Sequence, residues 1–137
     1  MGCILRIIGK KLDIDGFILK SKLNPEVKVY KGDPIFKTKP NGKKIPYSCL
    51  GIATSNAGFD EFDKQIKDTI LFFKKNKEKL SHIPLTKEID NATLDFGVYS
   101  KKSEDEFFVQ HFRFSHPLIK LANEFDLGIE IVIYSRS

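Results

Sequence analysis

The feature that most constrains this chain is an amphipathic stretch at residues 59–80. Its apolar side chains recur at three- and four-residue steps, which places them on one face of an α-helix. The other face is charged, and lysines gather in the last turns, where they complement the negative end of the helix dipole. The stripe consists of Phe59, Phe62, Ile66, Ile70, Phe73 and Leu80. We therefore expect one long helix that packs across a second layer of structure.

Strand patterns supply that second layer. Residues 3–8 form a nearly continuous apolar run, which is typical of a strand in a covered sheet. Residues 94–99 and 129–134 alternate apolar and polar side chains, as half-buried strands do. Shorter patterns predict strands at 27–31 and 107–114. The chain is therefore expected to combine several strands with a few helices.

The first helix has a recognisable start. Asp13 is placed as its N-cap, and the apolar residues Leu12 and Phe17 flank the cap as a hydrophobic staple. The helix is expected to run to about Leu23, because Pro25 disfavours a helical conformation at the residue before it.

A third helix is predicted at residues 117–125. Ser115 can cap it, and Pro117 falls in the first turn, where its missing N–H costs nothing. Gly128 follows the helix and is available for the left-handed position that often ends a helix.

Asn41 and Gly42 form the strongest short hairpin signal, since both residues tolerate positive φ. The flanking segments 35–39 and 44–54 are expected to pair as a basic hairpin. Lysine on an edge strand also prevents unwanted strand pairing, so a purely solubilising role is the plainer interpretation.

Together these elements predict a single α+β domain over residues 1–137, with a mixed, largely antiparallel sheet and helices packed on one face. Cys3 and Cys49 are far apart and are expected to be reduced thiols. The N-terminal apolar run is too short for a signal peptide, and no stretch reaches the length of a membrane span. We expect a cytoplasmic protein without a membrane anchor.

Chemistry-bearing motifs are few. His82, His111 and His116 are dispersed, and no pair of them has a spacing that fixes a catalytic or metal geometry. Cysteine spacing offers no zinc site, and no glycine-rich phosphate loop is present. The sequence therefore predicts neither an enzyme nor a metal or cofactor site, and favours binding of a macromolecule.

Five segments resemble a known family. They are LNPEV at 23–27, YKGD at 30–33, SCLGI at 48–52, SHPLIKLA at 115–122 and LGIEIVIY at 127–134. The chain resembles a bacterial family catalogued only as a domain of unknown function, number 4279. The resemblance implies an α+β fold without known enzymatic activity, and some similar proteins are suspected to be immunity proteins for bacterial toxins. It assigns no functional residue.

These observations predict an immunity-type protein that neutralises a cognate toxin by blocking its active site. Toxins that attack nucleic acid tend to be basic, so charge complementarity places the contact on acidic residues and one tyrosine. The candidate contact residues are Glu88, Asp90, Asp95, Tyr99, Glu104, Asp105 and Glu106. If the toxin presents an acidic face, the lysines of the hairpin take over.

The alternative is a small nucleic-acid-binding or regulatory module that uses the lysine-rich hairpin at 35–47, with rings available to stack on bases. The charge distribution allows it, because residues 1–44 carry a net charge of +7 and residues 45–137 carry −2. Only three of the 23 basic residues are arginine, the residue favoured for phosphate and guanine recognition, so nucleic acid is the less expected partner.

Overall fold

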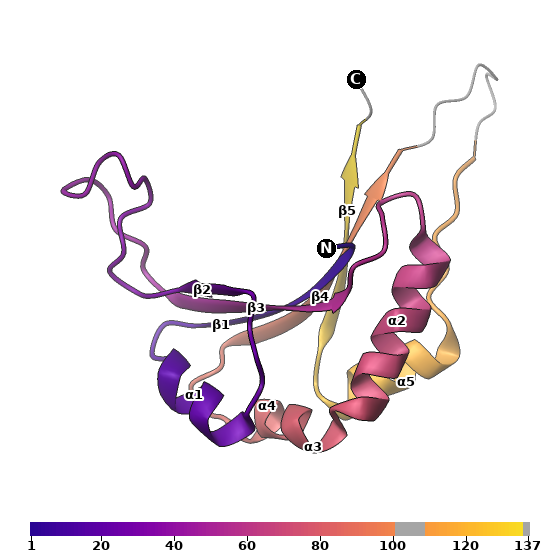
Figure 1. Ribbon diagram of the computed structural model, residues 1–137, viewed down its shortest axis with the longest axis horizontal. Coiled ribbons are helices and arrows are strands. Elements are labelled where there is room, and N and C mark those ends of the chain that lie inside the picture. Colours follow the sequence, from indigo (N-terminus) through magenta and orange to yellow (C-terminus); the bar gives the residue numbers. More distant parts are fainter. Residues whose placement is uncertain (101–108, 136–137) are drawn as a thin grey trace.

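Strand β1 (Cys3–Gly9) is the centre of the molecule, because both of its edges are paired. The computed structural model describes residues 1–100 and 109–135 (Figure 1). β1 pairs antiparallel with β3 (Ser48–Ser55) and with β4 (Asn91–Tyr99). The short β2 (Val27–Val29) adds antiparallel to β3, and β5 (Gly128–Tyr134) adds parallel to β4. The five-stranded order β2-β3-β1-β4-β5 confirms a mixed, largely antiparallel sheet.

Side chains alternate across this sheet, as the pleat requires. In β1 the side chains of Cys3, Leu5 and Ile7 are fully buried, whereas Arg6 between them is exposed. The registers carry the same division into the neighbours, so that Leu50 of β3 and Leu94 of β4 share the buried face. One face of the sheet therefore holds the core.

The helices cover that core face alone (Figure 1). They are α1 (Ile14–Ser21), α2 (Phe62–Lys75), α3 (Lys77–Leu80), α4 (His82–Leu85) and α5 (His116–Glu124). Ile66 and Phe73 of α2 are buried against the sheet, and the Phe73 ring meets the Phe125 ring edge-on at 5.8 Å. The expected α+β class, with helices packed on one face, is confirmed.

The predicted start of the first helix is confirmed in detail. The Asp13 carboxylate accepts a hydrogen bond from the Gly16 N–H at 3.1 Å, and Leu12 and Phe17 are both buried. The helix ends at Ser21, and Lys22 takes the left-handed conformation with φ 61°. A cap and a staple are local devices, so the sequence is sufficient to place them.

The prediction of a single long helix over residues 59–80 is wrong. The amphipathic stripe is divided between α2 and α3, which Asn76 separates with φ −114°. The Phe72 carbonyl accepts hydrogen bonds from the Asn76 backbone N–H at 3.0 Å and from the Asn76 side-chain amide at 2.9 Å, so Asn76 closes the last turn of α2. Phe59 lies before α2 and packs elsewhere.

The hairpin predicted at 35–39 and 44–54 is reduced to one bridge between Pro34 and Lys44. β3 begins only at Ser48. Gly42 N–H donates to the Lys39 carbonyl at 2.9 Å, so the tip is a turn centred on residues 40 and 41, neither of which has positive φ. Proline at the first central position favours this ordinary turn over the hairpin type that an Asn-Gly pair promotes.

The end of α5 also differs from the prediction. The left-handed residue is Asp126, with φ 57°, and Gly128 is the first residue of β5. Leu127 N–H donates to the Ala122 carbonyl and Asp126 N–H to the Asn123 carbonyl, which is a Schellman motif. Burial of Leu127 decides the register of this motif, and it places Asp126 rather than glycine in the left-handed position.

The strand predicted at 107–114 is not formed by its described part. Residues 109–114 are irregular, whereas residues 107 and 108 lie outside the described residues. Phe112 and Phe114 of this segment each pack edge-on against Phe62 of α2, at 5.3 and 5.5 Å between ring centroids. Phe114 also packs against Phe96 of β4 at 5.3 Å, so the alternation of apolar residues reflects ring packing against the core rather than strand pairing.

We expect Leu94→Ala to lower the free energy of unfolding by about 2–5 kcal/mol, because the change leaves a cavity where β4 meets the helices. Leu19→Ala, at a side chain that is 80% exposed, is the matched control and should change stability by less than about 0.5 kcal/mol. Urea denaturation followed by circular dichroism measures both. Equal losses in the two variants would contradict this assignment of the core.

Candidate functional site: the open face of the sheet

We call the face of the sheet that points away from the helices the open face. Strand registers assign its residues, because side chains of directly paired residues point to the same side. Most of its side chains are β-branched, small or polar. It comprises Ile4, Arg6, Ile8, Val27, Val29, Cys49, Gly51, Ala53, Asn91, Thr93, Asp95, Gly97, Tyr99, Glu130, Val132 and Tyr134. No described helix covers this face (Figure 1).

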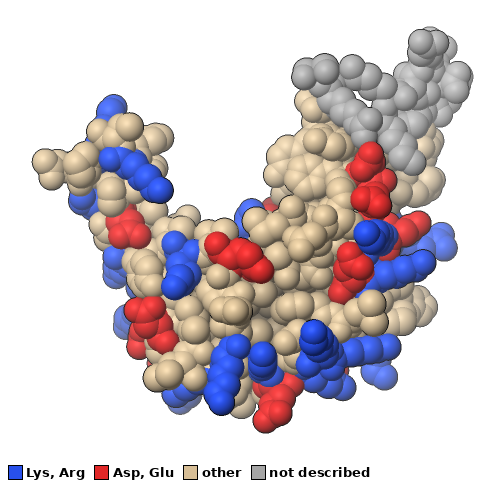
Figure 2. Space-filling model, in the orientation of Figure 1, with Lys and Arg blue, Asp and Glu red and all other residues tan. Residues whose placement is uncertain are grey.

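The open face is the floor of a hollow. Figure 2 shows a broad depression between two projections, and Figure 1 identifies one projection as the 30–47 loop and the other as the end where β4 and β5 rise. The base of the loop is held by bonds from Gly32 N–H to the Ile45 carbonyl and from Ile45 N–H to the Asp33 carbonyl, at 2.9 and 2.8 Å. The 30–47 loop is therefore held in place at its base, and it forms one wall of the hollow.

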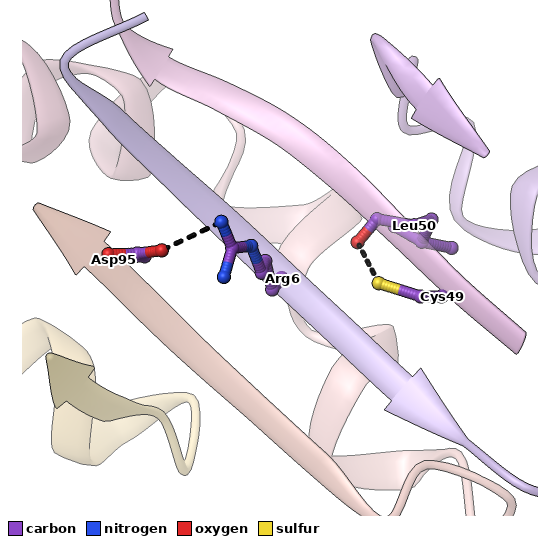
Figure 3. Close-up of polar contacts among 4 residues, drawn as sticks. All are labelled: Arg6, Cys49, Leu50 and Asp95. Carbon is purple, nitrogen blue, oxygen red and sulfur yellow. Dashed lines mark hydrogen bonds and ion pairs between the residues drawn. The ribbon is translucent and has the colours of Figure 1, made fainter. Parts of the chain in front are cut away.

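An ion pair lies in the middle of the floor. Arg6 Nη2 is 2.9 Å from Asp95 Oδ2 across the pair of strands β1 and β4 (Figure 3). Asp95 is only 7% exposed, whereas Arg6 is 47% exposed. Burial raises the pKa of the Asp95 carboxyl, the Arg6 guanidinium lowers it, and Glu130 raises it further, with a net rise. The desolvation of the carboxylate thus outweighs the attraction of its partner.

The two cysteines lie on opposite faces and are free, as expected. Cys3 is on the core face, where burial raises the pKa of its thiol to about 11. Cys49 is half-buried on the open face, where burial also raises the thiol pKa although Arg6 opposes the shift. Its Sγ lies 3.8 Å from the Leu50 carbonyl oxygen (Figure 3). A raised pKa lowers the fraction of reactive thiolate at Cys49, whose side chain lines the floor.

An aromatic cluster occupies one end of the floor. Phe59 stacks on Tyr134 at 5.1 Å and meets Tyr99 edge-on at 5.3 Å. Its ring lies over Gly97, where an added Cβ would come within 2.9 Å of it. Buried Gln65 of α2 donates to the Gly97 carbonyl at 2.9 Å and holds this end of β4 to the helix layer.

A pocket adjoins this cluster. It has a volume of about 880 Å³, and its described lining includes the rings of Phe59, Phe62, Tyr99 and Phe112. Sequence reasoning missed it, because Phe59 was assigned to a helical stripe. The available signal was Gly97, since a glycine inside an alternating strand often marks a close approach by another group.

The structure separates the predicted contact residues. Asp95 and Tyr99 lie on the open face, but Asp90 precedes β4 and accepts a hydrogen bond from Lys10 N–H at 2.8 Å, and Glu88 is near it in the chain. The nine residues of β4 span about 30 Å, so these acids do not share a patch with Tyr99. Glu104, Asp105 and Glu106 lie outside the described residues.

The histidines are not brought together as a centre. His82 is in α4, His116 begins α5, and His111 is in the irregular segment before it. Within residues 1–100 and 109–135, no group of three or more histidine, cysteine, aspartate or glutamate side chains could hold a metal ion. None of the helices in this part of the chain is both long and apolar enough to cross a membrane.

The protein is thus a small α+β protein whose sheet is covered by helices on one face and is exposed and concave on the other. A family model, described as Domain of unknown function (DUF4279), matches residues 1–136. The chain therefore belongs to this family. Comparison with the curated proteins and with the solved structures found no match.

The raised pKa of Asp95 predicts how the free energy of unfolding depends on pH. Because the pKa of Asp95 is raised in the folded state, the folded chain binds a proton more readily than the unfolded chain does. The wild type should therefore gain stability relative to Asp95→Asn as the pH falls from about 7 toward the ordinary pKa of 3.8. Urea denaturation of both proteins across this range measures the gap. A gap that moves in favour of the Asn variant as the pH falls would contradict the assignment.

Proposed function

We propose that this chain is an immunity-type protein that binds a cognate bacterial toxin on the open face and so blocks the active site of the toxin. One observation carries the proposal. Helices cover one face of the sheet, whereas the other face is left as the floor of a hollow between two walls (Figure 2). A broad concave surface suits a folded protein domain that projects a convex part into it.

The size of the surface fits a protein partner. Five strands at about 4.8 Å spacing and about seven residues of length give a floor of roughly 450 Å². The walls add to this, and a stable protein–protein contact needs about 800 Å² from each partner. The proposal therefore requires the partner to contact the walls as well as the floor.

The floor also has the composition of an interface centre. Its isoleucine, valine and tyrosine side chains supply apolar contact, and tyrosine is enriched among the residues that dominate binding energy. Asp95 is already paired with Arg6, so a partner that covers it need not supply a countercharge. The half-exposed Arg6 can still donate hydrogen bonds to the partner from its remaining N–H groups.

The charge of the walls indicates which charge the complementary surface of the toxin should carry. The 30–47 loop exposes five lysines and one aspartate, and Phe36 within it is 63% exposed. These lysines are Lys31, Lys37, Lys39, Lys43 and Lys44. Glu88 and Asp90 lie away from the aromatic cluster and do not form an acidic patch with Tyr99. The 30–47 loop therefore carries the larger concentration of charge beside the floor. The proposal therefore pairs an acidic patch of the toxin with this loop.

Thr93→Arg tests the proposal, because it places a long charged side chain in the centre of the floor without touching the core. The chain is co-expressed with the product of the adjacent gene, and co-purification and rescue of growth are measured. We expect the wild type to bind and rescue, and Thr93→Arg to lose at least about tenfold in affinity. Leu19→Arg on α1, on the helix side, is the matched control and should bind normally.

Two results would contradict the proposal. One is the absence of binding and rescue with every neighbouring gene product. The other is equal binding by Thr93→Arg and Leu19→Arg, which would place the contact elsewhere on the chain. Circular dichroism of both variants verifies that each is folded.

A second candidate rests on the 30–47 loop, whose exposed lysines and Phe36 could contact phosphates and stack on bases. If the loop binds single-stranded nucleic acid, the affinity should fall steeply with salt. With about four phosphate contacts, it should fall roughly 50-fold between 50 and 200 mM salt. Fluorescence anisotropy with a labelled oligonucleotide measures this, and Lys43→Gln with Lys44→Gln should flatten the slope. No binding at 50 mM salt would exclude this candidate.

A further inference from the structure

The two edges of the sheet are very different. β2 forms one edge with only three residues, one of which is Lys28, so it offers little to an approaching strand. β5 forms the other edge with seven residues, GIEIVIY, whose single charge is Glu130. It has no lysine, proline or bulge of the kind that usually protects an edge. An exposed apolar edge of this length presents unpaired backbone groups that can bind another strand.

The free hydrogen-bonding groups of this edge can be assigned. Ser100 N–H donates to the Tyr134 carbonyl at 2.9 Å, so the backbone of Tyr134 points toward β4. Bonding direction alternates along a strand, so Glu130 and Val132 also point toward β4. The N–H and C=O groups of Ile129, Ile131 and Ile133 therefore point outward. No hydrogen bond to them from the described residues is observed.

We propose that β5 pairs antiparallel with β5 of a second copy of this chain, so that two five-stranded sheets join into one continuous sheet. The pairing is self-complementary, as a two-fold axis requires. With Ile131 on the axis, Ile129 lies opposite Ile133 of the other copy. All three outward-pointing residues then form hydrogen-bonded pairs with their counterparts, and no outward group between residues 129 and 133 is left without a partner.

The side chains agree with this register. On the core side, three isoleucines from each copy form one ladder, in which β-branched side chains pack well across strands. On the open face, Glu130 lies opposite Val132, so the two carboxylates do not oppose each other directly. Gly128 lies opposite Tyr134 and adds no side chain that could clash with its ring.

These features favour a second copy over an unrelated extended segment, because this one register satisfies the backbone, the isoleucines and the single charge together. The contact is small, since it consists mainly of one strand from each copy. We therefore expect a dimer with a dissociation constant in the micromolar range, as for interfaces under about 1,200 Å². The dimer leaves the open face of each copy exposed, so this inference does not depend on toxin binding.

Sedimentation velocity of the purified chain over a range of concentrations tests the proposal. The main variant is Ile133→Pro, which removes an outward N–H without removing a bond to β4, at a side chain that is 57% exposed. We expect the wild type to pass from monomer to dimer as concentration rises, and Ile133→Pro to dimerise at least about tenfold more weakly. The matched control Ile133→Val keeps the N–H and the branched side chain and should dimerise like the wild type.

Hydrogen exchange supplies a second measurement that needs no variant. The amides of Ile129, Ile131 and Ile133 should become protected as the concentration rises, whereas those of Glu130 and Val132 should be protected at every concentration. A wild type that stays monomeric up to about 500 μM would overturn the proposal. So would a dimer that forms without added protection of the outward amides, because a different surface would then be responsible.

Discussion

The alternation of side chains along β1 is the constraint on which the rest of this structure depends. Leu5 and Ile7 point into the helix layer and are fully buried, whereas Arg6 between them points to the other side. Because β1 is paired on both edges, its registers impose this division on β3 and β4 as well. A shift of one residue would exchange the two faces, burying Arg6 and exposing the core. The described helices cover only the face that holds Leu5 and Ile7, and the opposite face is the open face.

The same constraint explains why the polar groups of the floor are tolerated. Asp95 sits beside Arg6 in the middle of the sheet, at a position that the pleat turns away from the core. Its carboxylate is poorly solvated, which raises its pKa, yet its partner remains half in water. A carboxylate held in this way is a modest cost to stability, and it gives the open face a fixed polar feature that a partner can recognise.

Local signals in the sequence were sufficient where the structure is decided locally. The Asp13 cap, its staple and the alternating strands at β4 and β5 follow from spacings of a few residues. Predictions failed where a tertiary contact decides. Burial of Leu127 shifts the end of α5, and rings that pack on Phe62 give the segment before α5 an alternation that resembles a strand. The open face could not be predicted, because a sequence shows which residues alternate but not which face the helices leave bare.

The central claim is that the sheet has one covered face and one open face, and the two cysteines report on them directly. Cys3 is fully buried on the core face, whereas Cys49 is only partly buried on the open face. Native-state labelling with a thiol reagent, read by mass spectrometry of peptides, tests the claim. The account predicts that Cys49 is labelled in the folded protein and that Cys3 is labelled only after unfolding. Equal protection of the two thiols, or faster labelling of Cys3, would contradict it.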